Sequence, residues 1–139
     1  MLVAMLLLGN KTCTMRKIYY LKTCDTCKRI LKQMQTAVSE DIYRNFIFQE
    51  IKTERVTVAQ LEEMYSLSNS YENLFSRRAK KYSQMNLKNE TISEIDYKQL
   101  LLEEYTFLKR PVILMEDKIF IGNSKKNVDV LLNHLKTYK

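Results

Sequence analysis

The chain has 139 residues, of which 45% are hydrophobic and 28% charged, and a formal net charge of +7. This length and composition suit one globular domain and exclude a chain that is disordered throughout. With 2 glycines and 1 proline, the chain is poor in the turn residues that an all-β design needs. The basic balance either favours anionic partners or reflects a solvated surface. No DNA or RNA motif is visible, so we expect no direct contact with nucleic acid.

The first residues form an apolar run at positions 1–8. No basic segment precedes this run and no small-residue cleavage site follows it, unlike in a signal peptide, and it is shorter than the ~20 residues that span a bilayer. We expect residues 1–14 to be an extension, either poorly ordered or arising from a mis-assigned start at Met1 instead of Met15. The alternative is a genuine extra strand or helical turn. Residues 15–139 are expected to form a single cytoplasmic domain without contact to a membrane.

A strand, a helix and a second strand are expected in the first third of the chain. Residues 18–21 are β-branched and aromatic, as in a strand, and residues 24–36 place apolar side chains at helical spacing. Residues 44–51 are predicted to form the second strand, with Phe46 and Phe48 in alternation. A strand–helix–strand unit of this length predicts parallel strands joined by a right-handed crossover.

The middle of the chain is predicted to be helical. Thr57 and Gln60 provide a capping box at the start of one helix, and Ser93 opens another. Residues 71–75 and 80–85 are predicted to be short helical turns between these two helices.

After Pro111 the pattern returns to strands. Residues 112–115 are apolar, residues 118–121 alternate, and the two residues between them predict a hairpin turn. Residues 122–124 then cap a final helix, whose inward residues we expect to be Val128, Val130, Leu131, Leu132 and Leu135. The order of elements predicts an α/β, thioredoxin-like fold: a four-stranded mixed sheet flanked by helices, with a helical insertion between the βαβ and ββα halves.

Cys24 and Cys27 stand in C-x-x-C spacing between the first strand and the first helix. The free amides and the dipole at a helix N-terminus favour a thiolate, which is the nucleophilic form of cysteine. Lys28 and Arg29 should lower the pKa of Cys24 further, against the opposing charge of Asp25. We expect Cys24 to be a nucleophile instead of an inert buried cysteine. Cys27 is expected to resolve the adduct formed on Cys24, or else only to pack.

Zinc binding is the alternative for these cysteines. A structural zinc site needs four ligands. Besides the pair, the chain offers only Cys13 and His134 as further cysteine and histidine side chains. We therefore expect no metal and no bound cofactor.

The most basic local cluster runs from Ser76 to Tyr82. Arginine presents a planar fork that suits tetrahedral oxyanions, so Arg77 or Arg78 is a candidate anion ligand. Spacing alone does not choose between these two arginines. Lys80 and Lys81 are expected to be solvated.

Three stretches together resemble the ArsC/Spx/YffB family of arsenate-reductase-like proteins. They are T-C-D-T-C-K at 23–28, S-R-R-A-K-K-Y at 76–82, and K-R-P-V at 109–112 followed by F-I-G-N-S at 120–124. The resemblance extends from about Met15 to the C-terminus and implies a thioredoxin-like fold. By position it implies that Cys24 is the nucleophile, that Arg78 is the family's middle arginine, and that Arg110 precedes a cis proline at Pro111. In the reductases these groups hold arsenate, and electrons arrive from glutathione and glutaredoxin.

Two departures from the reductase pattern leave the function open. Gly122 stands where the glutaredoxin-linked reductases have a third arginine, and Cys27 is typical of the Spx regulators, which bind the RNA polymerase α subunit and use C-x-x-C as a redox switch. Those regulators carry a glycine where this chain has Ser70. The resemblance thus implies a thiol oxidoreductase with a small oxyanion or thiol/disulfide substrate, a redox partner protein, and glutathione/glutaredoxin or thioredoxin as external reductant. The alternative is an Spx-like redox-sensing regulator bound to RNA polymerase.

Overall fold

The computed structural model describes residues 16–138, so the expected extension at residues 1–14 lies outside the described part. The elements in chain order are β1 (Arg16–Tyr20), α2 (Asp25–Ala37), α3 (Glu40–Arg44), β2 (Ile47–Glu50), α4 (Val58–Ser68), η1 (Glu72–Leu74), α5 (Lys80–Gln84), η2 (Leu87–Asn89), α6 (Glu94–Glu103), η3 (Tyr105–Phe107), β3 (Val112–Met115), β4 (Lys118–Ile121) and α7 (Lys125–Leu135). None of the helices between residues 16 and 138 has the length and apolar character to cross a membrane.

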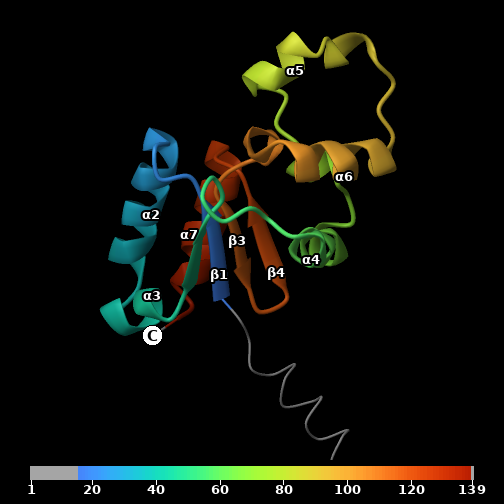
Figure 1. The fold of residues 1–139 in the computed structure, drawn as a ribbon. Helices are drawn as coiled ribbons and strands as arrows, with labels where there is room; N and C mark the ends of the chain where they lie inside the picture. Colours follow the sequence, from blue (N-terminus) through green and yellow to red (C-terminus); the bar gives the residue numbers. More distant parts are fainter. Residues whose placement is uncertain (1–15, 139) are drawn as a thin grey trace, which may run out of the picture.

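The four strands form one mixed sheet in the order β2-β1-β3-β4 (Figure 1). β1 and β2 are parallel, as the strand–helix–strand pattern predicts, with Ile18 opposite Phe48. β3 runs antiparallel to both β1 and β4. This is the thioredoxin-like α/β arrangement that the order of elements predicts, and the segment from α4 to η3 is the helical insertion between its two halves.

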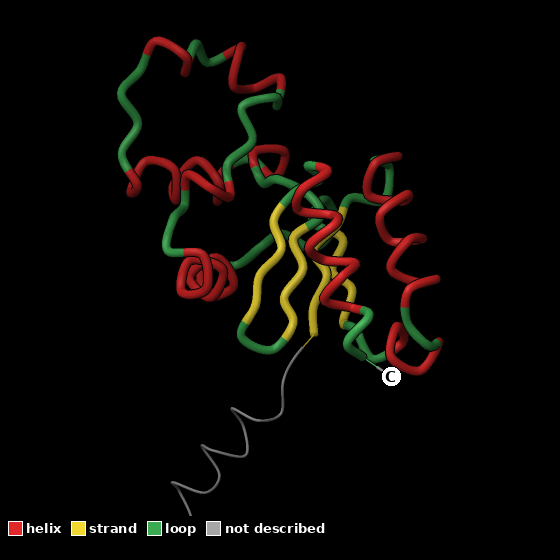
Figure 2. The backbone as a smooth tube through the Cα atoms, turned by 180° about the vertical axis from the view of Figure 1, so that it is seen from behind, coloured by secondary structure: helices red, strands yellow, loops and turns green. Residues whose placement is uncertain are grey.

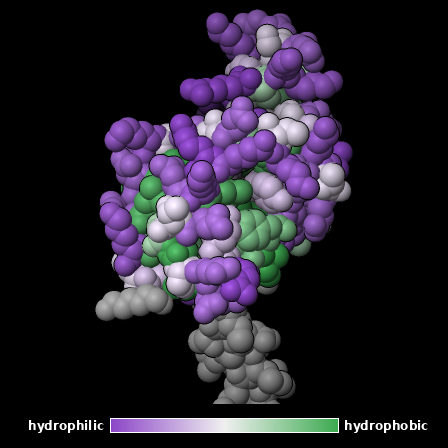
Figure 3. Space-filling model, turned by 90° about the vertical axis from the view of Figure 1, so that its left-hand side faces the viewer, coloured by the Kyte–Doolittle hydropathy of each residue, from purple (hydrophilic) through white to green (hydrophobic). Residues whose placement is uncertain are grey.

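The sheet separates two hydrophobic cores. Ile18 packs with α2 and α7 on one face, whereas the next residue, Tyr19, packs with α4 and α6 on the other, because successive side chains of a strand alternate between faces. Figures 1 and 2 show the same division, with α2 and α7 on one side of the sheet and α4 and α6 on the other. The part of the insertion around α5 projects beyond both layers, and Figure 3 shows this projecting end covered by hydrophilic side chains.

The edge of the sheet differs from the sequence prediction. The second strand was predicted at residues 44–51, but β2 is shorter and follows the short helix α3. Ser39 begins this helix by accepting a hydrogen bond from the amide of Ile42 at 3.3 Å. Phe46 is buried, but Phe48 remains 39% exposed because β2 is an edge strand. In the last helix, Val130 was predicted to point inward and is instead 51% exposed.

Gln49 is the buried polar side chain of β2, with 1% of its surface exposed. Its amide donates to Oε1 of Gln60 at 3.0 Å and to the carbonyl of Glu54 at 3.1 Å, and the Gln60 amide donates back at 2.8 Å. Gln60 also accepts from the amide of Thr57, completing the predicted capping box of α4. This pair of amides therefore ties β2 to the start of the insertion.

Replacing Gln49 with alanine is expected to destabilise the fold by about 2 kcal/mol, because buried amide and carbonyl groups lose their partners. Urea denaturation measures this change, and Gln33→Ala, at an exposed position of α2, is the matched control. Equal stability of the two variants would contradict the assigned role of Gln49.

Candidate functional site

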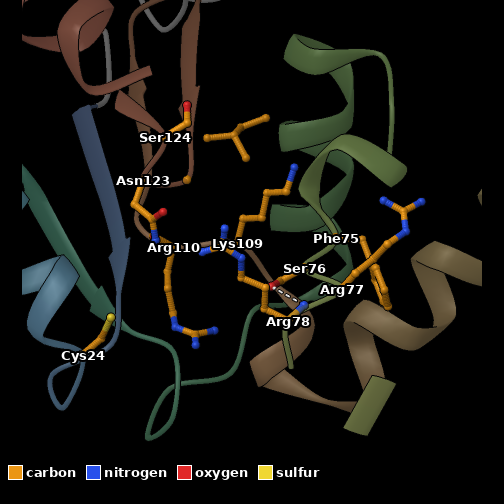
Figure 4. Close-up of a pocket in the computed structure, with 11 residues that line it drawn as sticks. Cys24, Phe75, Ser76, Arg77, Arg78, Lys109, Arg110, Asn123 and Ser124 are labelled. Carbon is orange, nitrogen blue, oxygen red and sulfur yellow. Dashed lines mark hydrogen bonds between the residues drawn. The ribbon is translucent and has the colours of Figure 1, made fainter. Parts of the chain in front are cut away.

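A cleft of about 400 Å³ lies at one end of the sheet, beside the start of α2 (Figure 4). Its walls come from four segments of the chain: Cys24, residues 75–78, Lys109 with Arg110, and residues 121–124. The insertion and the two halves of the sheet thus each supply part of the lining. Three residues predicted from the sequence, Cys24, Arg78 and Arg110, meet in this cleft.

Cys24 is the residue that immediately precedes the first turn of α2. Its carbonyl accepts the hydrogen bond from the amide of Lys28 at 3.0 Å, so the helix begins at this point, and its own amide donates to the carbonyl of Leu21 at 3.1 Å. The thiol is half-buried, and the backbone of Thr26 and Cys27 in the first turn lowers its pKa. The sulfur therefore lies where the free amides of the helix converge.

Burial alone would raise the pKa of Cys24, but hydrogen bonds outweigh it. The amide and thiol of Cys27 and the amide of Thr26, together with the positive charge of Arg110, hold the pKa of Cys24 below its ordinary value. The chief cationic contribution comes from Arg110, and not from Lys28 and Arg29 as the sequence predicted; both of those side chains are exposed on α2. The arrangement favours a thiolate at Cys24.

Cys27 has the opposite environment. Its side chain is fully buried, and burial raises the pKa of Cys27 to about 12, helped by the negative charge of an ionised Cys24. The backbone of Leu21 acts on the pKa of Cys27 in the other direction. Both cysteines are free thiols, and each affects the pKa of the other. The surroundings thus favour the thiol at Cys27 and the thiolate at Cys24, three positions earlier in the chain.

Arg110 is held by the backbone around it. Its Nη1 donates to the carbonyls of Thr106 and Leu108, each at 3.2 Å. Its Nε is buried and has no partner among residues 16–138. In Figure 4 its guanidinium group extends toward the side of the cleft where Cys24 lies. The peptide bond between Arg110 and Pro111 is cis, and Pro111 is buried behind the cleft instead of lining it.

The two neighbouring arginines of the insertion have different surroundings. Arg77 donates to Glu72 at 2.6 Å and to the hydroxyl of Tyr97 at 3.0 Å, and its guanidinium group points away from Cys24 (Figure 4). The Arg78 side chain lines the cleft and makes no hydrogen bond or ion pair within residues 16–138. Arg77 is therefore bonded to other residues of the insertion, whereas the Arg78 side chain faces the cleft without a partner among residues 16–138. Of the two arginines that sequence spacing could not separate, Arg78 is the better candidate anion ligand.

Sequence reasoning gave no role to two further residues of this region. Lys109 lines the cleft, although the sequence marked it only as part of the K-R-P-V stretch at 109–112. Glu50, at the end of β2, accepts hydrogen bonds from the amides of Lys22 and Thr53, both at 3.0 Å, and these bonds lower the pKa of its carboxyl group. Glu50 thereby fixes the loop that leads from β1 into Cys24. Neither a charge run nor a periodic pattern distinguishes it in the sequence.

No group of histidine, cysteine and acidic side chains within residues 16–138 is arranged to hold a metal ion. His134 of α7 was one candidate ligand for zinc. Its ring packs against the rings of Phe120 and Tyr138. Cys13, the other candidate, lies outside the described residues.

Comparison with known protein families matches residues 19–131 to the ArsC family. Among solved structures, a protein described as ArsC family related, from Bacteroides fragilis, superimposes with a TM-score of 0.68 at 19% identity, covering 84% of this chain and 96% of that one. A protein from Staphylococcus aureus gives 0.62 at 26% identity, covering 84% and 97%. An arsenate reductase from Vibrio cholerae gives 0.62 at 16% identity, covering 85% and 96%. No curated protein matches the sequence.

Replacing Arg110 with alanine is expected to raise the pKa of Cys24, because the thiolate loses a nearby positive charge. Alkylation by iodoacetamide follows the thiolate fraction, so its rate at neutral pH should fall about threefold to tenfold. The pH at which the alkylation rate reaches half of its maximum should also be higher in the Arg110→Ala variant.

Arg29→Ala removes an equal charge from the exposed face of α2 and is the matched control. Its alkylation profile should stay close to that of the unaltered protein. A larger shift for Arg29→Ala than for Arg110→Ala would contradict the assignment.

Proposed function

Because the chain belongs to the ArsC family, we propose that it is a thiol oxidoreductase in which Cys24 attacks an oxyanion or a disulfide bound in the cationic cleft. The observation that supports this most strongly is the position of the Cys24 sulfur, half-buried at the start of α2, with the amides of Thr26 and Cys27 directed at it and Arg110 nearby. Those groups favour the nucleophilic form, and the cleft gives a substrate access to it.

The first step forms a bond from the Cys24 sulfur to the substrate. With a disulfide, the thiolate of Cys24 displaces one sulfur, which leaves with the bonding electron pair, and a mixed disulfide remains. With an oxyanion, the sulfur bonds to the central atom, and one hydroxyl group of the oxyanion takes up a proton from the solvent and leaves as water. The guanidinium groups of Arg78 and Arg110 supply fixed positive charge where negative charge gathers, which lowers the barrier.

The second step uses Cys27. After its proton is lost, the Cys27 sulfur attacks the Cys24 sulfur, the bond from Cys24 to the substrate breaks, and the substrate leaves reduced by two electrons while a Cys24–Cys27 disulfide forms. An external thiol, either glutathione with glutaredoxin or thioredoxin, then reduces this disulfide. The proposed setting is the cytoplasm, where such thiols are kept reduced.

Cys24→Ser is expected to abolish reduction of arsenate and of small disulfides in assays coupled to glutaredoxin or thioredoxin, by roughly a thousandfold or more. Cys27→Ser should retain the first step and accumulate a mixed disulfide on Cys24 that mass spectrometry of the intact protein detects. Turnover by the Cys24 variant, or absence of turnover by the unaltered protein with every substrate and donor, would exclude the proposal.

Two variants, Arg78→Ala and Arg77→Ala, distinguish an arginine that binds the anion from one that only stabilises the insertion. We expect the Arg78 variant to lose about a hundredfold in kcat/KM with arsenate, because the removed guanidinium group faces the ligand. The Arg77 variant should mainly lose stability, since its side chain bonds to Glu72 and Tyr97. A greater kinetic loss for Arg77→Ala would reverse the assignment.

The regulator alternative has its own discriminating measurement. Ser70, where the Spx regulators have glycine, follows α4 and accepts a hydrogen bond from the amide of Asn73 at 3.0 Å. This contact gives no support for polymerase binding, so we favour the oxidoreductase. Binding to the purified C-terminal domain of the RNA polymerase α subunit, in oxidised or reduced form, would support the regulator instead.

A further inference from the structure

Lys109 and Arg110 are consecutive, but their side chains diverge within the cleft. Figure 4 shows the Arg110 guanidinium group extending toward the side where Cys24 lies, and the Lys109 ammonium group extending away from it. The alkyl chain of Lys109 packs beside Gly122: a Cβ atom built on Gly122 would lie 3.6 Å from Cβ and Cδ of Lys109. The cleft therefore has cationic groups in two separate places.

The Lys109 ammonium group has no hydrogen-bond or ion-pair partner among the residues that the structure describes. Burial and the positive charge of Arg77 lower the pKa of Lys109, while the charge of Glu72 acts in the other direction. The Glu72 carboxylate is itself engaged by Arg77 at 2.6 Å. A half-buried cation without a neutralising partner gains from an anionic ligand.

The cleft also has room for a ligand larger than an inorganic oxyanion. A water molecule takes about 30 Å³ in the liquid, and a tetrahedral oxyanion displaces only a few waters. The cleft measures about 400 Å³, so an oxyanion seated between Cys24 and Arg110 leaves most of it unfilled.

We propose that Lys109 binds a second anionic group of the substrate, separate from the atom that Cys24 attacks, so that the cleft selects organic disulfides and thiol adducts that carry a carboxylate or a similar anion. The inference rests on the proposed role of Cys24 as the nucleophile, and it adds the class of substrate. Arg110 acts on the end of the substrate that reacts with Cys24, and Lys109 binds the anionic group at the other end of the substrate.

Two aromatic disulfides test this selectivity, because one is dianionic, dithiobis(nitrobenzoate), and the other is uncharged, dithiodipyridine. With either reagent the Cys24 thiolate displaces one aryl thiolate, the disulfide bond of the reagent breaks, and a mixed disulfide forms. The released nitrothiobenzoate or thiopyridone absorbs at wavelengths where the parent disulfide does not, so stopped-flow absorbance gives the rate constant. The ratio of the two rate constants reports recognition of the anion apart from the nucleophilicity of the sulfur.

Lys109→Met is expected to lower the rate constant for the dianionic reagent about fivefold and to leave that for the uncharged reagent unchanged. Lys109→Arg should retain the preference of the unaltered protein. Lys32→Met removes the same charge from an exposed position of α2 and should change neither rate constant, which controls for the net charge of the chain.

The inference is overturned if Lys109→Met and Lys32→Met have equal effects with the dianionic reagent, or if Lys109→Met slows both reagents alike. These outcomes leave the proposed function intact. If the unaltered protein fails to react with the uncharged reagent, the role of Cys24 as a nucleophile fails, and this inference fails with it.

Discussion

The position of the Cys24 sulfur at the start of α2, beside the free amides of the first helical turn, is the feature on which the site depends. A helix N-terminus leaves these amides without partners in the helix, so an anion placed there is stabilised. Burial of the thiol works against ionisation, and the amides of Thr26 and Cys27, the Cys27 thiol and Arg110 together outweigh it. Cys27, one turn further on and fully buried, stays protonated. The same helix turn thus favours the thiolate at Cys24 and the thiol at Cys27.

The fold brings the charges to this sulfur from distant parts of the chain. The loop before α2 is fixed by Glu50 at the end of β2, and Arg110 enters at the start of β3. The insertion supplies Arg78 and engages Arg77 with its own residues, Glu72 and Tyr97. Because a thioredoxin-like core alone lacks the segment from α4 to η3, the insertion is what completes the cationic wall of the cleft.

Much of this organisation could be predicted from local patterns. The capping box at Thr57, the hairpin turn after Met115 and the C-x-x-C pair each carry a short-range signal, and all three occur where predicted. The edge strand was predicted too long because Phe46 and Phe48 suggested alternation, whereas Ser39 starts a helix before it. The burial of Gln49 and the roles of Glu50 and Lys109 depend on contacts across the fold, with Gln60, Lys22 and Gly122, which sequence spacing does not show.

The central claim is that the environment of Cys24 lowers its pKa, whereas the environment of Cys27 raises its pKa. The unaltered protein can be prepared with its cysteine residues carbon-labelled at Cβ. The NMR shift of each Cβ, followed as the pH is raised, then measures the pKa of each thiol separately. The account predicts that the Cys24 signal titrates below the ordinary cysteine pKa of about 8.5 and that the Cys27 signal stays in its thiol form to far higher pH. A Cys24 signal that titrates at or above the ordinary value would contradict it.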